Sequence, residues 1–236
     1  MERRTFLRSC ALAGGTGVAG GLVQKLAAAA AGQFKAYSRA RLVDEFGEPI
    51  RSRKLVVNRN YLFNYPFAGT PCFLLNLDKP TARAALVAGD GQRYEWTGGV
   101  GPKQAVVAYS AICAHKLAYP AREISFIRFQ EQASSTSKGG VIHCCAEHSV
   151  YDPAAGARVV GGPAPQPLAA IVLEHNARTD ELFAIGTVGA EQFDAFFAKY
   201  EFKLGMEHGT GRAQRPVGEA TACREMAQVC RQTVQC

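Results

Sequence analysis

Short stretches in which apolar and polar residues alternate follow one another from about residue 54 onward, separated by turn residues. Alternation with a period of two predicts strands that bury one face. Such strands are predicted at residues 54–58, 72–77, 84–88, 104–112, 123–129, 141–144, 158–160, 169–175 and 182–187. Gly89-Asp90-Gly91 is typical of a hairpin turn. The pattern therefore indicates an all-β fold built from small antiparallel sheets.

Helical periodicity is confined to the later part of the chain. Residues 191–200 place Phe193, Phe196 and Phe197 at helical spacing, which predicts a short amphipathic helix packed on the sheets. From about residue 206 the sequence becomes polar, and a last short helix is expected within residues 220–232. The expected architecture is thus all-β with short C-terminal helices.

The first 32 residues are expected to form a separate targeting segment. Arg3 and Arg4 begin a twin-arginine pattern. It is followed by an apolar, glycine-rich stretch and then by the small-residue run 27–31. The pattern predicts export by the twin-arginine route to the periplasm or the periplasmic face of the inner membrane. The segment could be removed as a signal or kept as a membrane anchor, and the sequence leaves both open.

Composition and charge narrow the class of protein. Hydrophobic residues make up 47% of the chain and charged residues 20%, which is typical of a globular protein. The net charge is +7, and the first 31 residues, with four basic side chains and one acidic, account for +3 of it. Since about +4 is then left for the rest, with no long basic run, we expect no nucleic-acid partner.

Two pairs of cysteine and histidine carry the candidate chemistry. Cys113 and His115 form a Cys-x-His pair, and Cys145 and His148 form a Cys-x-x-His pair, each directly after a predicted strand. Residues i and i+2 of an extended chain point to the same side, so each pair can reach one ligand. Two thiolates and two imidazoles suit either tetrahedral zinc or an iron–sulfur cluster with mixed ligands.

The residues that flank these pairs resemble those of Rieske [2Fe–2S] proteins. Residues 145–156 and the proline-rich stretch 162–168 are similar to the second cluster loop and the proline loop of that family, and the likeness extends over residues 104–188. The resemblance implies a [2Fe–2S] cluster in a cluster-binding subdomain. It also implies that Cys113 and Cys145 bind the buried iron, while His115 and His148 bind the outer iron.

The sequence departs from the respiratory members of this family in two ways. The two extra cysteines that form a disulfide between the cluster loops in those proteins correspond to Ala118 and Glu147 here. In addition, His148-Ser149-Val150-Tyr151 looks like the family's His-Gly-Ser-x-Tyr with the glycine deleted. Ser149 and Tyr151 are still expected to donate hydrogen bonds to a cluster sulfur and a ligand thiolate.

A longer connection than usual separates the two pairs. Between His115 and Cys145 lie 29 residues, which include the predicted strand 123–129 and the serine-rich loop 131–140. We expect them to form a hairpin beside the cluster that could dock a partner. Cys144 is interpreted as a small buried residue rather than as a cluster ligand. The pairing of Cys144 and of four other cysteines stays open: Cys72, Cys223, Cys230 and Cys236.

These observations predict an exported electron-transfer subunit without catalysis of its own. Its Rieske domain would span residues 33–205, and residues 206–236 would form a polar, cysteine-containing tail. The leading expectation is transfer from quinol, with a cytochrome b partner, to a cytochrome c. An alternative is the small Rieske subunit of a periplasmic molybdenum oxidase such as arsenite oxidase, and a less favoured one is a structural zinc module.

Overall fold

The structure is a computed structural model that describes residues 34–236. The predicted export segment, residues 1–32, lies wholly outside these residues. The regular secondary structure of the described chain is mainly β-strand, arranged in several sheets with one main helix. The expected all-β fold is thus confirmed as a mostly-β fold.

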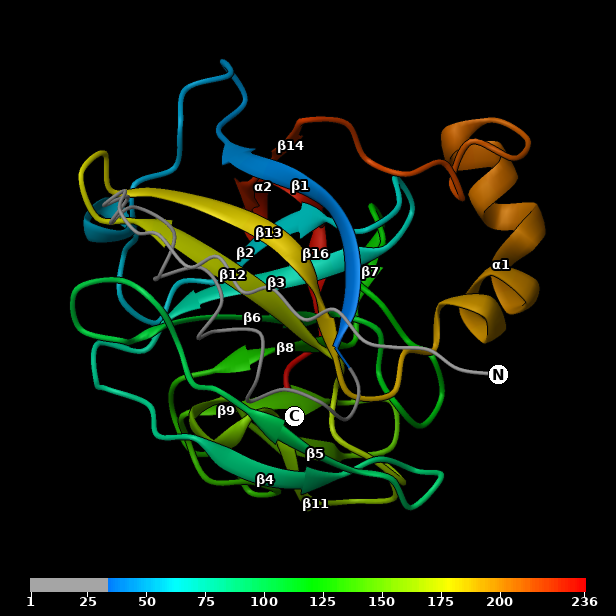
Figure 1. Cartoon of the computed structure of the whole chain (residues 1–236). Coiled ribbons are helices and arrows are strands. Elements are labelled where there is room, and N and C mark those ends of the chain that lie inside the picture. The colour runs from blue at the N-terminus through cyan, green and yellow to red at the C-terminus, as the bar shows by residue number, and fades with distance from the viewer. Residues whose placement is uncertain (1–33) are drawn as a thin grey trace, which may run out of the picture.

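The largest sheet has eight strands in the order β14-β1-β13-β12-β6-β3-β2-β15. Its neighbouring strands are antiparallel except for β1 and β14. The strands span Lys35–Val43 (β1), Tyr61–Asn64 (β2), Pro71–Asn76 (β3), Val106–Ser110 (β6), Ala170–Asn176 (β12), Glu181–Val188 (β13), Ala220–Ala222 (β14) and Arg224–Glu225 (β15). In Figure 1 this sheet occupies the upper part of the molecule.

A four-stranded antiparallel sheet with the order β11-β10-β9-β8 lies below it in Figure 1, together with the β4–β5 ribbon. Its strands span Ile127–Gln130 (β8), Val141–Cys144 (β9), Ser149–Asp152 (β10) and Arg158–Gly161 (β11). The two-stranded ribbons pair Ala84–Val87 (β4) with Arg93–Trp96 (β5), and Ile124–Ser125 (β7) with Gln232–Thr233 (β16). The helices span Phe193–His208 (α1) and Met226–Val229 (α2), with 3-10 turns at Ser52–Lys54 and Pro153–Ala155.

Strand β3 shows how the sequence separates two hydrophobic cores. Phe73 and Leu75 point into one core and Cys72 and Leu74 into the other, because successive side chains of a strand face opposite ways. The first core also contains residues of the small sheet, such as Tyr151, so it lies between the two sheets. A strand that is buried on both faces fits the continuous apolar run at this position.

One predicted strand is absent, and one predicted helix is shorter than expected. Residues 54–58 form no strand: Lys54 ends a 3-10 turn and Val57 makes only an isolated bridge to Asn76, so Val56 and Val57 remain 47% and 42% exposed. Residues 220–232 contain the expected last helix only as the single turn α2, and two short strands precede it. The reason is that β14 and β15 pair with the edges of β1 and β2, which offer unpaired backbone groups.

The segment expected as a polar tail is part of the fold. Helix α1 runs across the expected boundary to His208, so it is longer than predicted. Beyond it, β14 and β15 close the two edges of the large sheet, and β16 pairs with β7. The end of the chain lies near β9 in Figure 1.

A buried carboxylate fixes the turn between β12 and β13 against the chain before β2. Asp180, 7% exposed, accepts hydrogen bonds from Ser52 Oγ (2.5 Å) and from the backbone N–H of Arg53 (3.0 Å), and its Oδ1 lies 2.9 Å from His175 Nε2. Burial alone would raise the pKa of Asp180, but these hydrogen bonds outweigh it, and the pKa lies below its usual value.

Asp180→Asn is expected to lower the free energy of unfolding near pH 7 by about 1–3 kcal/mol, because charge-assisted hydrogen bonds are lost. The depressed pKa means that the Asp180 contribution is present above the unfolded pKa of about 3.9 and is lost as the pH falls through the folded value. Urea unfolding measured from pH 7 to pH 3 should show a smaller difference between variant and wild type at acid pH. A constant difference would contradict this, and Asp90→Asn, in an exposed turn, serves as the control.

Candidate metal centre

The first candidate arm is a tight turn that follows β6. Cys113 is 1% exposed, its N–H donates to Ala118 O (2.8 Å), and its carbonyl accepts from Leu117 N–H (2.9 Å). His115 lies within this turn and is partly exposed. The buried strand thus delivers the thiol to the interior and the imidazole to the rim.

Helix α1 braces this first arm from outside. Gln192 Nε2 donates to Ala114 O (3.0 Å), and Lys199 Nζ donates to Lys116 O (2.5 Å). The Tyr119 ring meets Phe196 edge to face at 4.9 Å. The helix was predicted, but no sequence signal indicated that Gln192 and Lys199 would hold the turn that carries Cys113 and His115.

The second arm is the connection between β9 and β10. Cys144 and Ser149 are directly paired across these strands, so residues 145–148 form the turn. Its last residue, His148, has a φ of +58°, a left-handed conformation in which glycine is favoured. Gly162 of the proline-rich stretch lies so close to this turn that a Cβ there would come within 2.1 Å of His148 O.

The adjacent cysteines of this arm have different partners. Cys144 is 1% exposed and belongs to the core that also contains Cys113. Cys145 forms a disulfide with Cys236. Strand residues that follow one another point to opposite sides, which explains this divergence. The structure therefore brings Cys144, and not Cys145, to Cys113.

Tyr151 completes a compact group around the two buried thiols. Its Oη lies 3.3 Å from Cys113 Sγ and accepts a hydrogen bond from Ala114 N–H (3.1 Å). A hydrogen bond with the Cys144 thiol lowers the pKa of Cys113, burial opposes this, and the contact with Tyr151 lowers it further. The same bond and burial raise the pKa of Cys144. This arrangement thus favours a thiolate at Cys113, which the neighbouring thiol of Cys144 stabilises.

The two predicted imidazole ligands, His115 and His148, contact different residues. His115 Nδ1 is 3.5 Å from Glu147 Oε2, whose other oxygen is 3.0 Å from Lys116 Nζ. His148 Nδ1 is instead 3.3 Å from His143 Nε2. The ligand set Cys113, His115, Cys145 and His148 stays a prediction, but in this structure it is divided between two groups.

Two buried polar atoms near Cys113 and Cys144 have no hydrogen-bond partner among the described residues. They are Ser149 Oγ and His115 Nδ1. Buried polar atoms normally have one, so each such atom requires an explanation. A hydroxyl next to Cys144 and an imidazole next to Glu147 are where a cluster sulfide and an iron would satisfy them. Two thiols, an imidazole and these unpaired atoms therefore fit an iron–sulfur cluster.

The second group consists of His143, His148 and Cys236, whose potential ligand atoms lie within 4.8 Å of one another. His143 is fully buried, and its Nδ1 is 2.9 Å from Ser137 Oγ. Burial, together with His148 and Arg128, lowers the pKa of His143. Because Cys236 is bonded to Cys145, this group offers two imidazoles but no thiolate.

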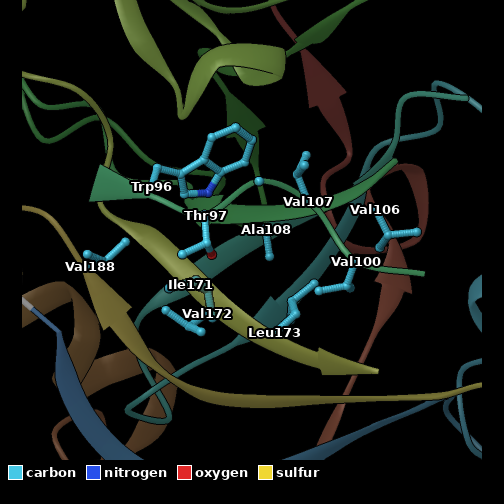
Figure 2. Close-up of a pocket in the computed structure, with 11 residues that line it drawn as sticks. Trp96, Thr97, Val100, Val106, Val107, Ala108, Ile171, Val172, Leu173 and Val188 are labelled. Atoms are coloured by element: carbon cyan, nitrogen blue, oxygen red, sulfur yellow. The ribbon is translucent and has the colours of Figure 1, made fainter. Parts of the chain in front are cut away.

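A separate cavity lies beside β6 and β12, and Figure 2 shows the residues that line it. Its volume is about 30 Å³. It is lined mainly by apolar side chains, among them Trp96, Val107 and Ile171, and by none of the cysteines or histidines described above. Its size suits roughly a single water molecule. We therefore assign no ligand to it.

Comparison with known proteins shows a likeness to a solved structure. No family model matches the chain. A solved structure, the soluble domain of Rieske protein II (soxF) from Sulfolobus acidocaldarius, is 27% identical in sequence, with a TM-score of 0.48. The match covers 66% of this chain and 82% of that one, so the chain is similar to a Rieske protein over most of that protein's length.

Proposed function

We propose that this protein transfers electrons through a [2Fe–2S] cluster of Rieske type, held between the turn at residues 113–118 and the turn at residues 144–148. The observation that carries the proposal is the pair of buried thiols, Cys113 and Cys144, near two buried atoms that have no hydrogen-bond partner, Ser149 Oγ and His115 Nδ1. Both cysteines are almost fully buried, whereas His115 is partly exposed. This gradient suits a redox group whose sulfur-bound side is insulated and whose other side reaches a partner.

The chain's own residues prepare this site before any cofactor binds. Helix α1 fixes the first turn, and Gly162 packs against the second. A bound cluster would supply one-electron chemistry, with a reduction potential set by its ligands and by hydrogen bonds to its sulfurs. Tyr151 Oη and Ser149 Oγ are placed to provide such hydrogen bonds.

The direct test is chemical analysis of the purified full chain. We expect iron and acid-labile sulfide in equal amounts, two of each per chain, and an electron paramagnetic resonance signal after reduction. Zinc without iron or sulfide would overturn the proposal and establish the structural zinc module. In that case the contact between His143 and His148 would become the place to look for the ion.

Tyr151→Phe is expected to leave iron and sulfide content unchanged but to lower the midpoint potential. The phenol contacts Cys113 Sγ, and hydrogen bonds to ligand sulfur stabilise the reduced, more negative state. A redox titration measures the effect. Tyr109→Phe is the matched control, because it removes a buried hydrogen bond to Pro153 O (2.7 Å) that does not involve these sulfurs. Equal potentials for Tyr151→Phe and wild type would contradict the assignment.

For the redox partners, our proposal is transfer from quinol, through a cytochrome b partner, to a cytochrome c, after export by the twin-arginine route. The surface support is the rim formed by His115, Lys116 and Glu147, where the candidate outer ligand His115 is partly exposed. Among the described residues, no helix is long and apolar enough to cross a membrane. Purification of the native complex tests the proposal: a cytochrome b would support it, and a molybdenum-containing subunit would favour the alternative oxidase.

A further inference from the structure

We propose that the second arm binds the cluster through Cys144 and Glu147 rather than through Cys145 and His148. The ligand set would then be Cys113, Cys144, His115 and Glu147, in which a carboxylate stands in place of the second imidazole. This inference rests on the proposed function, since it concerns how the same cluster is held. Four independent observations carry it.

The first observation concerns the sulfur ligands. A [2Fe–2S] cluster of this type needs two thiolates on one iron, so the two cysteines must face each other across the site. Cys113 and Cys144 do so: their thiols are hydrogen-bonded to each other and both are buried in one core. Tyr151 contacts this pair from the neighbouring strand β10.

The second observation is that Cys145 is already engaged. Its sulfur is bonded to Cys236, and its N–H donates to Phe126 O (2.6 Å). The last residues of the chain are held in place as well, because Val234 N–H donates to Ser125 O (2.9 Å). A sulfur in a disulfide is not a thiolate, so Cys145 cannot serve as a ligand while this bond persists.

The third observation concerns the other two ligands. Glu147 Oε2 is the oxygen next to His115 Nδ1, at 3.5 Å, a separation at which both atoms could bind one metal ion. His148 makes its contact with His143, at 3.3 Å. Carboxylate oxygen together with imidazole nitrogen is an ordinary ligand combination for iron in proteins.

The fourth observation is the register of the turn. The family's His-Gly-Ser-x-Tyr can be aligned without a deletion if its serine and tyrosine are matched to Ser149 and Tyr151. Its histidine then falls on Glu147 and its glycine on His148. The backbone agrees, because His148 has the positive φ, +58°, that glycine adopts most easily. The cysteine of the Cys-x-x-His pattern then falls on Cys144. The apparent deletion disappears once the ligands move by one residue.

A carboxylate ligand changes the charge of the site. Glu147 is anionic, whereas imidazole is neutral, so the bound cluster would carry one more negative charge than one with two histidines. Lys116 Nζ, 3.0 Å from Glu147 Oε1, offsets part of this charge. We therefore expect a lower midpoint potential in wild type than in a Glu147→His variant, which would restore two imidazoles.

The test compares two matched sets of variants in the full chain by iron and sulfide content, visible absorption and electron paramagnetic resonance. Cys144→Ser and Glu147→Ala are expected to lower iron and sulfide at least severalfold. His148→Ala and the double variant Cys145→Ser/Cys236→Ser should keep both near the wild-type level. Glu147→His should retain the cluster with a raised midpoint potential and a changed electron paramagnetic resonance spectrum. The changed spectrum is the deciding readout, because loss of a carboxylate that only lies near the cluster would also raise the potential but would leave the iron ligands as they are.

The outcomes separate the two proposals. A wild-type chain without iron and sulfide would overturn the proposed function. A wild-type chain that holds the cluster, but loses it in His148→Ala or Cys145→Ser/Cys236→Ser and keeps it in Cys144→Ser and Glu147→Ala, would overturn the ligand assignment alone. Far-ultraviolet circular dichroism of each variant distinguishes cluster loss from failure to fold. If Cys144→Ser fails to fold, the assignment is decided by Glu147→His against His148→Ala.

Discussion

Cys113→Ser is expected to abolish cluster binding, with iron and acid-labile sulfide falling to background. Cys113 is the one thiol that the sequence and the structure both place at the site, on the turn after β6 and in contact with Tyr151 Oη. Serine cannot replace a thiolate that binds iron, and no other described cysteine lies on that turn. The measurement is iron and sulfide per chain, together with visible absorption.

Cys72→Ser is the matched control for this experiment. Cys72 is also a fully buried free thiol on a strand of the large sheet, but it lies in the other core and interacts with Tyr65 O. Both substitutions place a hydroxyl in an apolar interior, so both should cost some stability. Only Cys113→Ser should lose iron. Equal loss of iron in the two variants would mean that the loss reflects general destabilisation rather than removal of a ligand.

The second large effect is expected from removal of the disulfide between Cys145 and Cys236. The bond joins residues 91 positions apart, and closing a loop of this length restricts the unfolded chain strongly. Cys145→Ser/Cys236→Ser should therefore lower the free energy of unfolding by about 2–5 kcal/mol, measured by denaturant unfolding. A dithiol reductant should destabilise wild type by a similar amount and leave the double variant unaffected. Equal stability of variant and wild type under oxidising conditions would contradict the prediction.

The sequence predicts several of the strands, although it misses β1, the longest of them. The segments that became β3, β6, β9, β12 and β13 carry apolar runs or alternation strong enough to locate them. It does not predict β14 and β15, which are only three and two residues long. Such strands exist because β1 and β2 offer free edges, and sequence patterning carries no information about edges that form elsewhere in the chain.

Some residues of the candidate site could likewise be placed from the sequence, and others only from the structure. Cys113, His115 and Tyr151 could be placed there from motif spacing and resemblance. The partner of Cys145 could not, since connectivity between distant cysteines does not follow from sequence alone. The assignment of Cys144 depends on which of two adjacent residues faces inward, and a shift of one position in a strand reverses every side chain. The structure makes that choice by burying Cys144 in the core that contains Cys113 and by bonding Cys145 to Cys236.

The disulfide of Cys145 also bears on the order in which the protein can be assembled. Before this bond forms, the second turn presents two neighbouring thiols, and iron delivered at that stage could be captured by either. Once Cys145 is joined to Cys236, Cys144 is the sulfur that remains on this turn to meet Cys113. Formation of the Cys145–Cys236 disulfide would thus decide which of two adjacent sulfurs is available to iron.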